Sequence, residues 1–304
     1  MSWFRGRSRR PSPPPPQWTS APESSHTYGL LNEAPAEDCE RAEKFCQVNT
    51  PETARLLPSS DIDRIATEKC AAWGLELLHT DDSYRETFKG EIHNQTKSRG
   101  TGVATKVVSY ATCKDCCLFS NLPLMASLYY RPQDGGVYFE LTIQEMQGII
   151  AIGTTCRPYP HYRLPGWHRL SAALHLDDMC KFYENPDGGQ DSGFCGGRSP
   201  GIGDTIGCGY EFTAGGTMFF TFNGERLVPD AFKGLYLRDG HDVYAAIGID
   251  GENEFTVNFG GDFFMWQPAN EWSWRLNRHV GQLSAPPAPI FEELPAYTLR
   301  PSQS

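Results

Sequence analysis

The stretch 203–228, GDTIGCGYEFTAGGTMFFTFNGERLV, most constrains what this chain can fold into. Apolar side chains alternate with other residues along Asp204–Tyr210 and again along Met218–Phe222. A period of two is typical of half-buried strands, because successive side chains point to opposite faces. Gly215-Gly216 separates the two runs, and Asn223-Gly224 is a preferred two-residue hairpin turn. The stretch therefore predicts a three-stranded antiparallel meander with one apolar face, which a second sheet must cover.

Short alternating runs with turn residues between them continue along the rest of the chain. We predict further strands at Trp73–His79, Val103–Ser109, Cys116–Leu122, Val137–Ile143, Ile149–Thr154, Leu170–Leu176, Cys180–Glu184, Val243–Ile249 and Phe255–Phe259. Turns are expected at Asp177-Asp178 and Asp250-Gly251, and loops at Lys89–Gly102 and Pro186–Gly203. The 30 glycines and 23 prolines favour many turns and few long helices. This pattern predicts an all-β fold, an antiparallel β-sandwich.

Composition divides the chain into four parts. Residues 1–58 are rich in proline, serine and acidic residues, and we expect a disordered tail because such a segment buries too little apolar surface. The part 59–72 is expected to hold a short helix over Asp61–Ala72, with Ser60 as its N-cap. The sandwich takes 73–268, and 269–304 form a C-terminal extension with a proline-rich end.

Charge and hydropathy exclude several classes of function. The net charge of −10 disfavours binding to a phosphate backbone, so we expect no nucleic-acid partner, and the arginines of the first 20 residues are interpreted as solvated. No run of about 18 apolar residues occurs, which predicts no transmembrane segment in this chain. The N-terminus has no apolar core of a secretory signal, so we expect a cytoplasmic protein.

The ten cysteines are interpreted as reduced, small apolar side chains in a cytosolic protein. Cys113, Cys116 and Cys117 include the C-x2-C spacing of a zinc site, but no second pair follows at a suitable distance. We therefore expect no metal and no other cofactor.

The order of several segments resembles a SPRY domain. These segments are VYFELTI, IAIGTTCRPYPHYRLPGWHRLSAALHLDD, GDTIGCGY, MFFTFNGERL, YAAIGIDG and VNFG, and the resemblance covers roughly Trp73–Trp266. The Arg-Pro-Tyr-Pro and Leu-Pro-Gly-Trp pieces are most similar to SPRY domains of fungal adaptors for WW-containing HECT ubiquitin ligases, and also to that of Ran-binding protein M. The resemblance implies a bent, concanavalin A-like two-sheet sandwich that binds protein segments through its loops and has no catalytic activity.

The chain departs from the fungal adaptors in one respect. Those adaptors carry a transmembrane span upstream of the SPRY domain, and this sequence shows none. A relative without the span and an incomplete chain both fit this difference. Endosomal or vacuolar residence is then expected only through partners.

The loop Arg157–Trp167 is the candidate surface for a client protein. Its candidate binding residues are Arg157, Tyr159, His161, Tyr162 and Arg163. Arginine and aromatic side chains dominate protein-binding hot spots, and binding residues concentrate on loops of rigid sandwiches. For Trp167 we favour a structural role, packed under the loop with Leu164 and Pro165.

The C-terminal tail carries a second candidate site. Leu294, Pro295 and Tyr297 form an L-P-x-Y segment after the proline-rich Ala285–Pro289. An extended proline-stiffened segment suits the aromatic groove of a WW domain. The hypothesis is that these residues recruit a WW-domain HECT ubiquitin ligase.

Two other classes of function were weighed against the adaptor. Asp250, Glu252 and Glu254 stand two residues apart, a spacing that could align carboxylates for a jelly-roll glycan hydrolase. However, Asp250-Gly251 is itself a turn signal, which places Glu252 in the turn. A lectin is disfavoured because no calcium site is marked. We interpret the chain as a non-enzymatic adaptor for ubiquitination or sorting, with a scaffold subunit that lacks ligase recruitment as the alternative.

Overall fold

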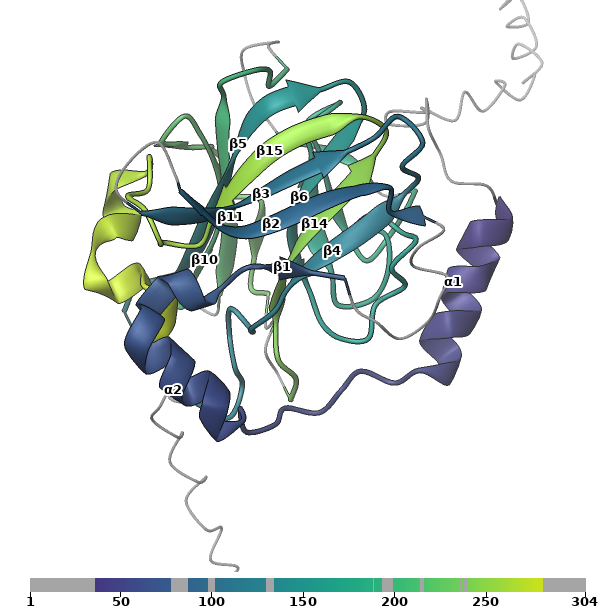
Figure 1. The fold of residues 1–304 in the computed structure, drawn as a ribbon. Helices are drawn as coiled ribbons and strands as arrows, with labels where there is room; N and C mark the ends of the chain where they lie inside the picture. The colour runs from purple at the N-terminus through teal and green to yellow at the C-terminus, as the bar shows by residue number, and fades with distance from the viewer. Residues whose placement is uncertain are drawn as a thin grey trace, which may run out of the picture.

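The computed structural model describes residues 36–77, 87–97, 102–129, 134–187, 189–192, 199–213, 216–235, 237 and 240–280. These residues form two antiparallel sheets packed face to face, which confirms the predicted sandwich (Figure 1). The first, called the β6 sheet, has the order β1 (Leu75–Glu76), β4 (Cys116–Ser120), β14 (Tyr244–Asp250), β6 (Ile149–Thr155), β7 (Ala172–His175), β8 (Cys180–Tyr183) and β9 (Gln190–Asp191).

The second, called the β5 sheet, is centred on β5. Its order is β12 (Glu225–Arg226), β11 (Thr217–Phe222), β10 (Thr205–Glu211), β5 (Gly136–Met146), β15 (Asn253–Asn258), β3 (Val103–Ser109) and β2 (Gly90–Lys97), and β13 (Phe232–Lys233) pairs with β11. The predicted meander is β10, β11 and β12, with Cys208 opposite Phe220. Asn223 and Gly224 have φ of 49° and 81°, as the predicted hairpin turn requires.

The two sheets enclose one main apolar core. It includes Val107, Leu118, Phe139, Leu141, Ile152, Cys208, Phe220, Ile247, Phe255 and Val257. Strands β4 and β6 are buried at every position, whereas β15 alternates between buried and half-buried residues. Because β4 and β6 are buried on both faces, another part of the chain must cover the outer side of the β6 sheet.

Asn94 joins the edges of the two sheets. Its Nδ2 donates to the Leu75 carbonyl and its Oδ1 accepts from the Leu75 amide, each at 2.9 Å. The side chain therefore takes the place of a neighbouring strand for β1.

One expectation about strands is wrong, and one turn joins strands of different sheets. Lys89–Gly102 was expected to be a loop, but Gly90–Lys97 is the edge strand β2. An edge strand pairs on one side and faces solvent, so its polar sequence hides its alternation. Asp250-Gly251 does form a turn, but β14 and β15 belong to different sheets and do not pair with each other.

The structure of the N-terminal part differs more from the prediction. Residues 36–58 of the expected disordered tail are described, and they include helix α1 (Ala36–Val48), so the expectation of disorder is wrong there. The average composition of 58 residues conceals one segment in which alanine, glutamate, arginine and lysine, which favour helix, make up more than half of the residues. Helix α2 (Ser59–Glu68) and the 3-10 turn η2 (Lys69–Ala72) confirm the predicted short helix. Ser60 is not its N-cap, because the helix begins one residue earlier, after Pro58.

The described C-terminal segment lies on the outer face of the β5 sheet. Three 3-10 turns, η4 (Gln267–Asn270), η5 (Trp272–Trp274) and η6 (Leu276–His279), follow β15 and form the yellow segment of Figure 1. The tail residues Leu294, Pro295 and Tyr297 lie outside the described residues. Among the described helices, none is long and apolar enough to cross a membrane.

Candidate functional site

Residues 156–171, called the 156–171 loop, connect β6 to β7 and cover the outer side of the β6 sheet. The Cys117 amide donates to the His161 carbonyl at 2.8 Å, so the loop continues the pairing of β4 beyond the short β1. A Cβ at Gly248 would lie 2.6 Å from Pro165 Cδ, which is closer than real contacts allow. Glycine in β14 therefore lets the loop lie flat on the sheet.

Arg157 anchors the start of the loop. Its Nη2 donates to the Ser120 carbonyl at 2.6 Å and to Glu76 Oε1 at 2.9 Å. The guanidinium also stacks 3.9 Å from the centre of the Tyr244 ring. Arg157 is buried, so its side chain ties the loop to the sandwich and presents no face to solvent.

Tyr159 is fixed in the same way. Its hydroxyl donates to the Leu164 carbonyl at 2.6 Å, and its ring packs edge-on against Phe119. Burial raises the pKa of this hydroxyl. Tyr159 thus closes the loop on itself.

Arg163 and His168 form a buried pair inside the loop. Arg163 Nε donates to His168 Nε2 at 3.0 Å, which requires that nitrogen to carry no proton. Burial first, and then the charge of Arg163, lower the pKa of His168 to about 4, so the imidazole is neutral at neutral pH. The guanidinium also lies 4.4 Å from the centre of the Trp167 ring.

Trp167 packs beneath the loop, as expected for a structural residue. It is 6% exposed and clusters with Leu164, Phe182 and Ile149 on the outer side of the β6 sheet. These residues form a small apolar cluster between the loop and the outer face of the β6 sheet.

Of the five candidate residues, Tyr162 contacts helix α1 through its side chain. His161 packs edge-on against its ring, at 5.2 Å between centroids. The Arg41 guanidinium of α1 covers the same ring at 3.6 Å from its centre. The structure thus places Tyr162 between the loop and helix α1.

The structure buries the side chains of all five predicted residues. Each is at most 9% exposed. Arg157 and Tyr159 point into the sandwich or the loop, whereas Tyr162 is covered from outside by α1. Two features of this surface were missed in the sequence, Arg169 and the whole of α1. Arg169 stands two residues after the Leu-Pro-Gly-Trp piece and carries the type of side chain that could have marked it.

The carboxylates weighed for a glycan hydrolase are not gathered on one face. Asp250 ends β14 of the β6 sheet, whereas Glu254 lies in β15 of the β5 sheet. Glu254 forms an ion pair with Lys106 at 2.8 Å. Glu252 is exposed in the turn between them.

The thiols near the start of β4 are buried, and none forms a disulfide with another described cysteine. Cys113 Sγ and Cys116 Sγ are 3.8 Å apart, and burial raises the pKa of Cys116 and of Cys117. In the described part of the chain no three histidine, cysteine or acidic side chains converge as a metal site.

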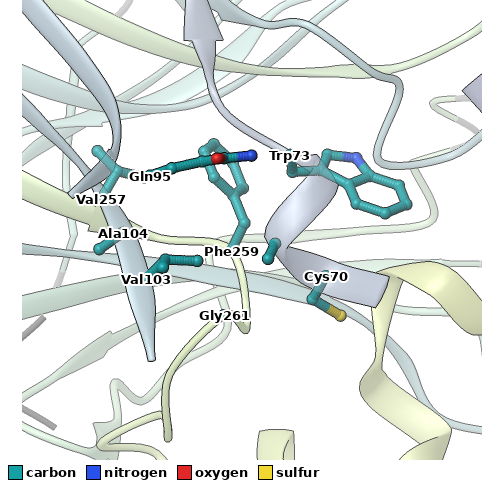
Figure 2. Close-up of a pocket in the computed structure, with 9 residues that line it drawn as sticks. Cys70, Trp73, Gln95, Val103, Ala104, Val257, Phe259 and Gly261 are labelled. Atoms are coloured by element: carbon teal, nitrogen blue, oxygen red, sulfur yellow. The ribbon is translucent and has the colours of Figure 1, made fainter. Parts of the chain in front are cut away.

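A concave region lies between η2 and the edge of the β5 sheet. Figure 2 shows the amide end of Gln95 pointing toward Trp73 and overlapping the Phe259 ring in this view, while the Cys70 sulfur points away. The Cys70 sulfur donates to Asn277 Oδ1 at 3.0 Å. An adjoining cleft of about 250 Å³ is lined by Arg64, Trp73, Asn94 and Asn121, among others. The two asparagine amides already bond to the backbone of residues 72–75, so this region serves to join the sheets.

Comparison with known proteins agrees with this architecture. Residues 136–262 match the model of the SPRY domain. Protein ssh4 of Sclerotinia sclerotiorum is 34% identical over 176 residues, which are 57% of this chain and 30% of that protein. Protein ssh4 of Aspergillus fumigatus is 27% identical over 290 residues, which are 93% of this chain and 50% of that protein.

A third relative carries the domain in its name. The SPRY domain-containing protein C285.10c of Schizosaccharomyces pombe is 31% identical over 60% of this chain and 43% of its own length. The chain thus spans half or less of the length of these relatives. A solved human SPRY domain aligns with a TM-score of 0.40 and 22% identity, over 52% of this chain and 93% of that one.

Proposed function

Because this chain carries a SPRY domain, a protein-interaction module, we propose that it is a non-catalytic adaptor that binds a segment of a client protein. The 156–171 loop is the surface proposed for the client, with Arg157, Tyr159, His161, Tyr162 and Arg163 setting its shape. Buried residues of this kind act on binding by fixing the loop rather than by touching the client. A loop that is rigid before binding loses little conformational entropy when a partner docks.

The observation that carries this proposal is the way the loop is built. It is pinned at its start by Arg157 and at its end by the Arg163–His168 pair, over a sheet that is buried on both faces. Its outer side meets a helix from another part of the chain through Tyr162. A fixed loop that holds a peptide segment is the arrangement that a protein-binding module needs.

The second half of the proposal concerns the tail. Leu294, Pro295 and Tyr297 are proposed to bind a WW domain of a HECT ubiquitin ligase, which would hold the ligase near the client and raise its local concentration. The tail's sequence and the resemblance to fungal ligase adaptors support this step. A cytoplasmic location is part of the proposal, and the described cysteines, which form no disulfide with one another, support it.

The tail is tested by titrating WW domains with the full chain. Tyr297→Ala should weaken WW binding at least about tenfold, because the tyrosine fills one of the two slots of the groove. Thr298→Ala, next to the motif, is the matched control and should leave affinity unchanged. If Tyr297→Ala binds WW domains as the unsubstituted chain does, the ligase-recruiting role fails and the scaffold subunit is the better interpretation.

A further inference from the structure

We propose that the surface beneath α1 is a binding site for a helical segment of a partner protein, and that α1 occupies this site as an internal competitor. The inference rests on the proposed role of the 156–171 loop in client binding. Figure 1 shows α1 on the outside of the sandwich, away from α2 and linked to it by an extended stretch. The site is defined by Tyr162, Arg169 and Pro158, which contact α1 or the arginine that holds it.

The helix is attached along one face, on which Asp38, Cys39, Phe45 and Cys46 are half-buried. Ala42 is its fully buried side chain, at 0% exposure, while Val48 near its end is 81% exposed. A 13-residue helix is marginal in water by itself, so α1 depends on this attachment for its structure. An element held along one face opens more readily than the strands beneath it.

The contacts that do exist are specific for a helix. Arg169 Nη1 donates to the Cys46 carbonyl at 2.8 Å, and its Nη2 donates to the Pro158 carbonyl at 3.0 Å. Cys46 lies in the last turn of α1, where carbonyls have no partner within the helix and the helix dipole is negative. Arg169 therefore recognises the C-terminal end of a helix.

The other contact recognises side chains of the helix. The Arg41 guanidinium lies over the Tyr162 ring, and the small side chain of Ala42 lets the helix approach the loop closely. The partner that fits this site is a short helix with a basic residue followed by a small one, about two turns before its C-terminus. Tyrosine and arginine on the receptor side are typical of protein-binding hot spots.

The segment after α1 is anchored independently. The Glu52 amide donates to the Arg157 carbonyl at 2.7 Å, and the Ala54 amide donates to the Gly240 carbonyl at 3.1 Å. If a partner displaces α1, the helix stays tethered close to its site. The tether keeps its effective concentration high, which makes it a competitor that a partner must outbind.

The experiment measures binding of a labelled peptide of residues 36–48 to the full chain by fluorescence anisotropy, with reductant present. Ala42→Arg places a large charged side chain at the buried contact and should free the site. We expect this variant to bind the peptide at least about tenfold more tightly than the unsubstituted chain does. Glu43→Arg, exposed at the next position, is the matched control and should bind as weakly as the unsubstituted chain.

Two further variants keep the result decisive. Adding Arg169→Ala to Ala42→Arg should abolish peptide binding. If Ala42→Arg lowers the melting temperature of the sandwich, Arg41→Glu is used in its place, because it should undock α1 without a larger side chain. Equal affinity of the unsubstituted chain and both undocked variants would overturn the proposal. So would failure of folded Arg41→Glu to bind the peptide. Neither result would touch the WW titration, so the adaptor proposal stands or falls separately.

Discussion

The two sheets are both covered on their outer faces, but the covers are attached in different ways. The C-terminal segment covers the β5 sheet with a second aromatic core of Tyr138, Phe219, Phe264, Trp266 and Trp274. Trp266 lies 5.0 Å from Phe219 and 4.8 Å from Trp274, between ring centroids. By contrast, α1 at the β6 sheet buries one alanine fully.

The sheets prepare for their covers with the same device. A Cβ at Gly209 would lie 2.2 Å from the Phe219 ring, and one at Gly248 would clash with Pro165. Glycines in the strands thus admit rings and loops close to the backbone on both sides. What differs is the outermost layer. Aromatic burial makes the C-terminal segment part of the domain, while α1 buries one alanine fully and Cys39, Phe45 and Cys46 only in part. A fixed cover and a replaceable cover therefore differ in how much apolar surface they bury.

The largest expected effect is on the aromatic cover. Trp266→Ala should lower the free energy of unfolding by about 3–5 kcal/mol, because it leaves a cavity among four other rings. Urea denaturation followed by far-UV circular dichroism measures this. Trp272→Ala is the control in the same segment, since Trp272 is 62% exposed. A loss below about 1 kcal/mol for Trp266→Ala would mean that the C-terminal segment is no more fixed than α1.

A smaller effect is expected at the base of the 156–171 loop. Arg157→Ala should cost about 2 kcal/mol, mainly because the Ser120 carbonyl loses a charged hydrogen-bond donor inside the protein. Glu76 adds little, since its side chain is 41% exposed and solvent screens the ion pair. The loop therefore belongs with the fixed parts, unlike the helix that lies on it.

The matched control is Arg55→Ala, measured in the same urea titration. Arg55 is 64% exposed, and its Nη2 lies 3.8 Å from Glu52 Oε2, so its loss should change stability by less than about 0.5 kcal/mol. Equal losses for the two arginines would show that the loop is not anchored as the contacts indicate.

How far the sequence predicts this molecule depends on whether a signal is local. Alternation along Met218–Phe222 and the Asn223-Gly224 turn are local, and both strand and turn were predicted. The edge strand β2 was missed because it pairs with a neighbouring strand on one side only. Its other side faces solvent, so its sequence is polar and shows no clear alternation. Helix α1 was missed because composition was averaged over a long segment.

For the candidate site, which remains a proposal, the sequence did not predict which way the side chains point. Arginine and aromatic residues serve equally in hot spots and in buried stacks, so residue types could not tell which way Arg157 or Tyr159 points. The contact that fixes the direction of the Arg157 side chain is its hydrogen bond to the Ser120 carbonyl, 37 residues away in the chain. Pairings over such distances carry no mark in a single sequence.

The smallest expected effect lies where α1 meets the sandwich, and it depends on pH. Burial, and then the charge of Asp250, raise the pKa of Asp115 from 3.8 to about 7. The charged groups that act on it are Asp250, Arg163, Asp38 of α1, Lys114 and, as further titrating neighbours, Cys113 and Cys116. Since the folded chain holds this proton to a higher pH than the unfolded chain, stability is lost as the pH rises from about 4 to about 7.

The lowered pKa values of His168 and His175 change stability in the opposite sense, so the effect of Asp115 is measured as a difference between two chains that both keep these histidines. Between about pH 6 and about pH 7, urea denaturation should show that the unsubstituted chain loses about 1 kcal/mol of stability relative to Asp115→Asn. Asp38→Asn tests the contribution of α1, because the Asp38 carboxylate acts on Asp115 only while α1 is docked. If α1 is the replaceable cover, Asp38→Asn should leave most of this difference in place. The same pH dependence in the unsubstituted chain and in Asp115→Asn would contradict the assignment to this junction, and complete loss of the difference in Asp38→Asn would make α1 as fixed as the aromatic cover.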